Sequence, residues 1–484
     1  MDRLKTASHI SSHTLLNVLA NFSRIITSSL VLIYVARKLG PFQYGIVSIG
    51  LSVAAIAQLF CDFGVSTSTA RFLADRETPQ SRVYHNGLLL NISLSLIFSI
   101  ILFMSAETIA PLLNLDSAVH LKIVCIFTFF TSLFYFSTSS LQGIKKSNLI
   151  ALLNFLQNII SGILIFAAAY LGLEAAGVLL GYSISTAIIW IAAFIVLRKT
   201  FRMTKRMING DIIRNILSYA LPLLVTSSSY LLLLRGPPIL LSMFVNPDAV
   251  SYLHIPMRLA EVVSLPAYSL SIVIAPFFTI KERTKGNLQW LYVKIFKYSL
   301  VFYLPSGLFF FLAASRIINS IFGSEYSNAA TVLIIFSFYI PFFSISIFTG
   351  KILDFLGLAK QKSVMFIIAA AITIISSVIV IPTFKETGAA MAITIPYSLF
   401  SIYTIIKSSR ECGVKLSNYL SKAAAMIPAL LLAGITASFV LQSLPGLRGL
   451  IIAFAAFTVV FTISATILRL IRFGEVRKLI STWK

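Results

Sequence analysis

The stretch NVLANFSRIITSSLVLIYVARKLGPFQYG, residues 17–45, decides the fold. Its apolar part is as long as the roughly 20 residues that a helix needs to cross the hydrocarbon core of a bilayer. It carries one arginine, Arg24, and closes with a proline turn at Pro41. A second apolar run, residues 219–243, carries Arg235 and is also followed by a proline. Each of these two predicted spanning helices carries one arginine and is followed by a proline turn. We therefore predict that the protein consists of two halves that face each other.

The composition of the chain places nearly all of it in a membrane. Of its 484 residues, 58% are hydrophobic and 11% are charged, and the mean hydropathy is +0.92. A water-soluble domain of this composition does not have enough polar residues to cover its surface. Apolar runs recur about 14 times, with short loops between them. The sequence therefore predicts an all-α polytopic membrane protein with about 14 transmembrane helices.

The formal charge of +23 reflects topology rather than a nucleic-acid surface. Most of the 39 lysines and arginines lie at the ends of apolar runs, in the tails and the even-numbered loops. Because cytoplasmic loops carry the excess of basic residues, both termini are predicted to lie in the cytoplasm. We expect a multi-pass protein of a bacterial or archaeal cell membrane, whose basic loops contact anionic lipid headgroups.

No motif for making or breaking covalent bonds is present. Cys61, Cys125 and Cys412 lie far apart, the histidines lack ligand spacing, and no segment has the pattern of a cleavable signal peptide. The sequence has no phosphate-binding loop, nucleophile elbow or zinc-protease motif. We therefore expect a transporter rather than an enzyme, with no catalytic residues, no metal site and no cofactor.

The chain repeats itself at an offset of about 206 to 214 residues. Gly143 corresponds to Gly357, and Glu174 corresponds to Glu386. Because an even number of predicted spans separates the copies, the repeats point the same way through the membrane, which predicts two six-helix lobes with a site between them. The predicted divisions are an N-terminal lobe, a basic cytoplasmic linker, a C-terminal lobe, and two last helices with a cytoplasmic tail, at residues 1–197, 198–214, 215–407 and 408–484.

Charged side chains inside spanning helices are costly unless they are paired or face water, so each one is a candidate site residue. Arg24 lies about 17 residues before Pro41, or about 25 Å along a helix. Asn17 and Asn21 share its helical face. We interpret this face as the anion-binding wall of a water-filled cavity; the alternative is an arginine that extends to the inner interface.

Two further arginines complete the predicted substrate-binding set. Arg235 lies about 12 residues, or about 18 Å, before Pro247. The Gly236-Pro237-Pro238 that follows it interrupts the helical hydrogen bonds, which is tolerated where backbone faces protein or a wet cavity. Arg258 and Glu261 share one helix face, either as a local pair or as a pair that opens when an anionic substrate or an ion arrives. Substrate binding is predicted for Arg24, Arg235, Arg258, Asn17 and Asn21.

Charged residues near the predicted cytoplasmic helix ends are candidates for gating or coupling. Asp62 precedes Phe63-Gly64 and stands shortly before Arg71, an arrangement that fits an inner gate or, alternatively, a solvated helix end. Lys351 and Asp354 are spaced to pair with each other on a helix. The gating or coupling set therefore comprises Asp62, Arg71, Glu261, Lys351 and Asp354.

A family resemblance rests on Leu39-Gly40-Pro41-x-x-Tyr44-Gly45, on Asp62-Phe63-Gly64 with Arg71-Phe72, and on the Gly-x-x-Lys loops at Gly143 and Gly357. With these motifs the whole chain resembles the polysaccharide transporter branch of the multidrug/oligosaccharidyl-lipid/polysaccharide flippase superfamily. The resemblance implies about 14 helices in two lobes around a central cationic cavity. It also implies coupling to H+ or Na+, and a polymerase and glycosyltransferases of the same pathway as partners.

The function expected from this resemblance is that of a flippase. Its substrate would be a polyprenyl-pyrophosphate-linked oligosaccharide, such as an O-antigen, capsule or exopolysaccharide repeat unit, carried to the outer leaflet by alternating access. One rival is a drug/cation antiporter of the same fold, whose site would be lined by carboxylates rather than arginines. Another is a membrane-embedded glycosyltransferase or ligase, which usually needs a large outer loop or an acidic metal site. A passive scramblase is a third.

Overall fold

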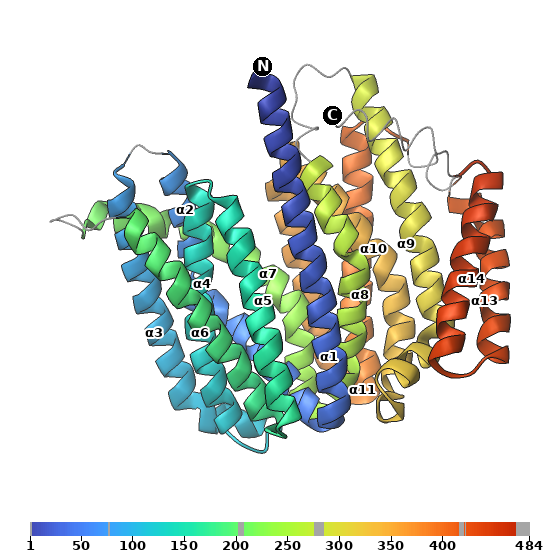
Figure 1. Ribbon diagram of the computed structural model, residues 1–484, viewed down its shortest axis with the longest axis horizontal. Coiled ribbons are helices and arrows are strands. Elements are labelled where there is room, and N and C mark those ends of the chain that lie inside the picture. The colour runs from blue at the N-terminus through green and yellow to red at the C-terminus, as the bar shows by residue number, and fades with distance from the viewer. Residues whose placement is uncertain are drawn as a thin grey trace. The chain divides into compact units, whose positions relative to one another are not determined.

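The computed structural model describes the backbone of residues 2–75, 78–201, 208–274, 285–415, 421 and 423–470. It describes the side chains of these residues except those of 2–28, 223, 225–227, 272–274 and 285–288. The described backbone is almost entirely α-helical (Figure 1). The chain forms two compact units, Met1–Ser251 and Tyr252–Lys484. The lobe boundaries expected at residues 197, 214 and 407 remain predictions.

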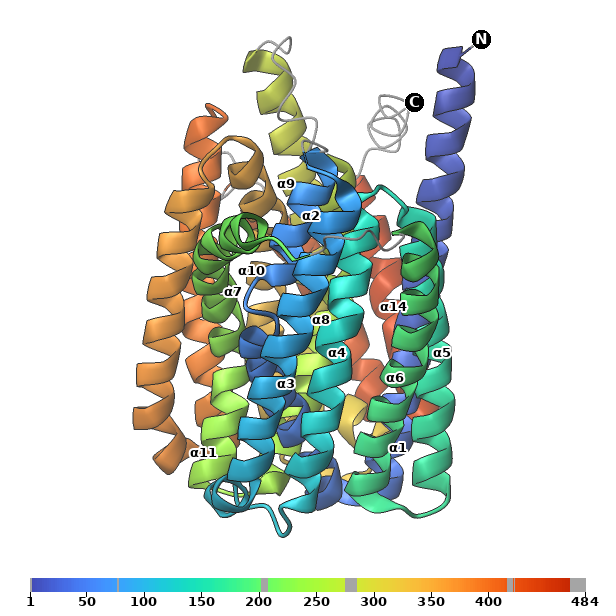
Figure 2. The same cartoon turned by 90° about the vertical axis from the view of Figure 1, so that its left-hand side faces the viewer.

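The first unit is built from long helices that run side by side (Figures 1 and 2). Helix α4 is central, because it packs against α1, α2, α3 and α6, whereas α5 packs mainly against α1 and α6. Helix α7 packs against α1, α2 and α3. The helices are α1 (Asp2–Asp62), α2 (Val65–Asp75), α3 (Gln80–Leu112), α4 (Val119–Gly143), α5 (Ser147–Tyr170), α6 (Glu174–Thr200), α7 (Gly210–Phe244) and the start of α8 (Pro247–Ile274).

Two backbone breaks shape the N-terminal helices. Helix α1 bends at Gly40, whose φ of 72° is left-handed. Pro41 follows directly, so the bend lies at the proline turn that the sequence predicts. The second break separates α1 from α2, where Phe63 has φ 50° and Gly64 has φ 81°. Helix α1 therefore ends at Asp62, and the chain begins a separate helix, α2, at Val65. By contrast, α7 continues through Pro237 and Pro238, which remove backbone donors without ending the helix.

The second unit contains the remaining helices. Helix α10 packs against α9 and α11, and α13 and α14 pack against each other and against α9. Helix α11 bends at Lys385, which has φ 48° and so separates two apolar segments. The elements are the rest of α8, α9 (Lys285–Ile321), the 3₁₀ turn η2 (Ser324–Tyr326), α10 (Ala329–Phe355), α11 (Ala359–Glu411), α13 (Ile427–Ser443) and α14 (Gly446–Ile467).

The helices have the lengths and surfaces of membrane spans. In the described part of the chain, nine helices are long and apolar enough to cross a membrane. Helix α3 exposes large apolar side chains such as Ile97, Ile101 and Met104. An apolar surface of this kind faces lipid, where only helices and closed barrels satisfy their backbone hydrogen bonds. Helix α10 is instead largely buried inside its unit.

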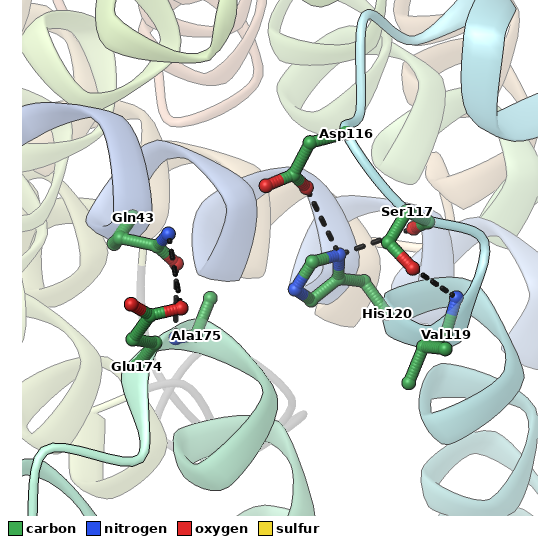
Figure 3. A network of polar contacts seen from close by, with 7 residues as sticks. All are labelled: Gln43, Asp116, Ser117, Val119, His120, Glu174 and Ala175. Carbon is green, nitrogen blue, oxygen red and sulfur yellow. Dashed lines mark hydrogen bonds and ion pairs between the residues drawn. The ribbon is translucent and has the colours of Figure 1, made fainter.

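Polar contacts join helix ends of the first unit, among them the contact of Gln43 on α1 with the start of α6 (Figure 3). Gln43, three residues after the α1 bend, accepts a hydrogen bond from the Ala175 amide at 3.1 Å, at the start of α6. Asn114, before α4, donates to the Ser242 carbonyl of α7 at 2.8 Å. A Cβ atom on Gly45 would lie 1.9 Å from the Pro247 carbonyl oxygen. Glycine at position 45 therefore permits the close approach of α1 to the start of α8.

Candidate functional site

The first unit contains a pocket of about 660 Å³ between α2, α4 and α5, which we call the α2–α5 pocket. Its walls combine amides, hydroxyls and one arginine, although two of the helices that form it, α4 and α5, are largely apolar. Such a lining is suited to a ligand rich in hydroxyl groups that carries negative charge. The polar lining residues are Thr67, Arg71, Thr131, Thr138, Ser139, Gln142, Asn154 and Gln157.

Helix α2 forms one wall of the pocket because it is amphipathic. Its buried face includes Val65, Thr69 and Leu73, and Arg71 lies on the opposite face. Helix α2 approaches α4 closely at Gly143, where a Cβ atom would lie 2.5 Å from the Ala70 carbonyl oxygen. Glycine at position 143 therefore lets α2 and α4, which form two walls of the pocket, come into close contact at the end of α4.

Arg71 is the one charged residue in the described lining of the pocket. Its guanidinium carbon lies 4.1 Å from the centre of the Tyr219 ring of α7. Its Nε lies 3.9 Å from an Asp75 carboxylate oxygen, one helical turn away. About half of the Arg71 side chain is exposed, so the ion pair with Asp75 contributes little to stability. The ring orients the guanidinium, which retains donors for a ligand.

A buried polar cluster lies where α1 ends and α2 begins. Asp62 is 7% exposed, and one of its carboxylate oxygens accepts hydrogen bonds from the Ser66 amide at 3.2 Å and from the Ser66 hydroxyl. The Asn91 amide nitrogen donates to the same oxygen at 3.2 Å and to the Ser132 hydroxyl at 3.1 Å. The Ser95 hydroxyl donates to Ser132 at 2.8 Å. We call these five residues the Asp62 cluster.

The structure places the predicted site residues in different parts of the chain. Arg235 is partly buried in α7 of the first unit. Arg258 pairs with Glu261 at 2.8 Å in the second unit. This is the local pair that the sequence predicts as one of two alternatives. Asp354 pairs with Lys362 of α11, and Lys351 is exposed. The side chains of Asn17, Asn21 and Arg24 lie outside the described residues. The binding and gating roles of all these residues remain predictions.

The sequence singled out Arg71 as a gating or coupling candidate rather than as a binding residue, and the rest of the pocket lining was not predicted. The missed signal is helical spacing of polar residues within apolar spans. On α4, Thr131, Thr138 and Gln142 share one face, and on α5, Asn154 and Gln157 share another. Polar groups in a spanning helix that repeat every three or four residues predict a face turned away from lipid.

The second unit contains a cavity of a different kind. A space of about 720 Å³ lies between α9, α10, α11 and α13, and its lining is almost entirely apolar, with Leu300, Phe342 and Leu430 among the residues. Hydrocarbon fits such a surface, whereas a sugar or phosphate would lose its hydrogen bonds with water there. The polar candidate site is therefore the α2–α5 pocket.

The chain resembles a known protein family and a relative in sequence. A profile of the family described as "Polysaccharide biosynthesis protein" matches residues 10–282, more than half of the chain. The uncharacterized membrane protein MJ1068 of Methanocaldococcus jannaschii is 27% identical over 221 residues. This alignment covers 44% of each protein, so the match spans less than half the length of that relative.

Two solved structures have similar folds. The lipid II flippase MurJ, in an inward closed conformation, superimposes with a TM-score of 0.79 at 16% identity, covering 96% of this chain and 100% of MurJ. An inward-facing multidrug resistance MATE family transporter of the MOP superfamily gives a TM-score of 0.64 at 15% identity, covering 83% of this chain and 98% of that one. These similarities confirm the predicted fold class, an all-helical multi-pass membrane protein.

Proposed function

The chain belongs to the polysaccharide biosynthesis protein family, and we propose that it is a flippase for a polyprenyl-pyrophosphate-linked oligosaccharide. It would carry the oligosaccharide from the cytoplasmic to the outer leaflet by alternating access. The fold is that of MOP-superfamily transporters, and its similarity to a protein named lipid II flippase supports a lipid-linked substrate. Enzymes that build and polymerise the glycan would be its partners in the pathway.

The α2–α5 pocket is the observation that carries this proposal. A volume of about 660 Å³ lies within the range of about 300–1,000 Å³ typical of ligand sites. Gln142, Asn154 and Gln157 offer amide donors and acceptors to sugar hydroxyls, and the Tyr135 ring offers an apolar face. Arg71 would bind a pyrophosphate or an acidic sugar through its planar fork of donors. The polyprenyl chain would remain in lipid, because moving its hydrocarbon from lipid to a polar pocket gives no favourable hydrophobic free energy.

Transport by purified protein in liposomes tests the proposal. The substrate is a fluorescent polyprenyl-pyrophosphate oligosaccharide, and its movement is read by quenching from one side of the membrane. We expect Arg71→Ala to slow movement by about tenfold or more, because a charge-assisted hydrogen bond is lost, and Arg71→Lys to retain part of it. Arg198→Ala, an exposed arginine at the end of α6, is the matched control. Arg24→Ala and Arg235→Ala test the sequence-predicted cationic cavity in the same assay.

The outcomes separate the rival functions. If the glycolipid moves equally fast with wild type, Arg71→Ala and Arg71→Lys, the α2–α5 pocket takes no part in transport. Wild-type protein that moves no glycolipid but exchanges small organic cations would be a drug/cation antiporter. Appearance of a new glycosidic product would instead indicate a transferase or ligase.

A further inference from the structure

The turn that ends α4 has a lysine in a position that usually holds glycine. The Lys145 amide donates a hydrogen bond to the Gln142 carbonyl at 2.9 Å, and the Lys146 amide donates to the Leu141 carbonyl at 2.9 Å. This pair of hydrogen bonds is a common helix-ending motif, and its left-handed residue is most often glycine. Lys145 takes that place with a φ of 60°. Because its Cβ atom approaches a backbone carbonyl oxygen in this conformation, the lysine is strained.

Other helices of the chain end in the same turn without a lysine. At the end of α10, the Gly357 amide donates to the Asp354 carbonyl at 3.2 Å, and the Leu358 amide completes the motif. The residues in the left-handed position at the ends of α3, α5, α11 and α14 are Asn114, Gly172, Gly413 and Arg469. Glycine or asparagine closes four of these five turns, so the turn itself does not require a basic residue at position 145. A strained residue that folding does not require indicates a function.

Lys145 and Arg71 lie at the same end of the α2–α5 pocket. Gln142 and Gly143, the last two residues of α4, line the pocket at this end. A Cβ atom on Gly143 would lie 2.5 Å from the Ala70 carbonyl oxygen, and Arg71 is the next residue of α2. Lys145 follows Gly143 by two residues. The close approach of α2 to the end of α4 therefore brings the two cations to one end of the pocket.

The two lysines of the turn differ in their contacts. Lys146 Nζ donates to the Thr200 hydroxyl at the end of α6, at 3.3 Å. Lys145 is exposed, and no carboxylate among the described residues forms an ion pair with it. Helix α5 begins at Ser147 with no acidic residue in its first turn, so the positive end of its dipole adds to the charge of the lysines. The surroundings of Lys145 in the described chain therefore favour an anion.

We propose that Lys145 and Arg71 bind the two phosphates of the substrate's pyrophosphate, one cation to each phosphate, so that the pocket selects a pyrophosphate over a monophosphate linkage. This inference rests on the proposed function and decides which part of the substrate Arg71 contacts. The pyrophosphate joins the hydrocarbon to the glycan and so lies at the membrane surface, where spanning helices such as α4 end. The flexible side chain of lysine reaches a phosphate as a point charge, whereas arginine provides a planar fork of donors.

Calorimetry with two water-soluble probes tests the proposal on the purified full-length protein. The probes are one oligosaccharide linked to a methyl group through a pyrophosphate or through a monophosphate, so they differ by one charged phosphate. Wild type is expected to bind the pyrophosphate probe about tenfold more tightly, the effect of one charge-assisted hydrogen bond. Lys145→Gln should reduce this preference to about twofold or less, and Lys145→Arg should keep most of it. Lys146→Gln is the matched control, because it removes the same charge from the same turn, and it should keep the full preference.

Lys145→Gly separates a role in binding from a role in folding. Glycine relieves the left-handed strain, so this variant should unfold at the same temperature as wild type or at a higher one. It should nevertheless lose the preference for pyrophosphate as Lys145→Gln does. A residue that only closed the turn would instead give a stable glycine variant with unchanged binding.

Three outcomes would overturn this inference alone. The first is equal affinity of wild type for the two probes. The second is an equal loss of preference in Lys145→Gln and Lys146→Gln, which would assign the turn to a general attraction of anions such as lipid headgroups. The third is Lys145→Gly protein that keeps the full preference. In each case glycolipid movement that depends on Arg71 would leave the proposed function standing. Wild type that binds neither probe and moves no glycolipid would overturn the proposed function, and this inference with it.

Discussion

Arg71 lies between a carboxylate and an aromatic ring, and the two neighbours hold it differently. The contact with Asp75 is long and exposed, so solvent screens it. The contact with the Tyr219 ring is close and directional. We therefore attribute the orientation of the guanidinium mainly to the ring.

Replacing Tyr219 tests this attribution. Tyr219→Leu removes a cation–π contact of about 0.5–1 kcal/mol at an exposed site, which corresponds to binding weaker by about two- to fivefold. Tyr219→Phe keeps the ring and should bind as wild type. Calorimetry with the water-soluble pyrophosphate-linked oligosaccharide measures both affinities. If Phe weakens binding as much as Leu does, the tyrosine hydroxyl rather than the ring face is responsible.

At the scale of elements, the break between α1 and α2 organises the candidate site. It lets α2 leave the direction of α1, so Arg71 and Thr67 form a wall of the pocket. The break depends on Gly64, whose φ of 81° is left-handed and whose added Cβ would lie 2.8 Å from the Ala220 carbonyl oxygen of α7. Glycine meets both demands, because it has no side chain.

Gly64→Ala is therefore expected to destabilise the protein. Gly446, at the start of α14, has a similar φ of 69° but nothing within 4 Å of an added Cβ, so Gly446→Ala isolates the cost of the backbone conformation. Gly64→Ala should cost about 1–3 kcal/mol more, through overpacking against α7. Thermal unfolding of both variants measures the difference, and equal melting temperatures would contradict the close contact. The affinity for the oligosaccharide headgroup should fall in Gly64→Ala alone.

At the scale of the whole molecule, the distribution of basic residues predicts orientation. Ser147 begins α5 directly after Lys145 and Lys146 of an even-numbered loop, whereas Ser443 ends α13 directly before the odd-numbered loop that leads to α14. Both serines are exposed, and the native cysteines are buried. A membrane-impermeant maleimide should label Ser443→Cys in intact cells and should label Ser147→Cys after the membrane is opened. The reverse pattern would place the termini outside.

The amino-acid sequence by itself determined the class of protein and most of its helices. A run of about 20 apolar residues has few alternatives to a spanning helix, because unpaired backbone groups are too costly in lipid. The bends at Gly40 and Lys385 both lie where the sequence signals a break. Gly40 precedes a proline, and Lys385 lies with Glu386 between two apolar runs. Local chemistry therefore predicted both bends.

Only the tertiary structure decided which polar residues meet. Thr67, Thr131 and Asn154 lie on three helices, and packing turns them towards one pocket. Asp62 was predicted as a gate residue, but its contact with Asn91 comes from a neighbouring helix. The physical reason is that helical periodicity defines a face within one helix, whereas the rotation and neighbours of that helix depend on contacts between residues far apart in the chain. The sequence determined the helices and their polar faces, and packing decided where those faces form a site.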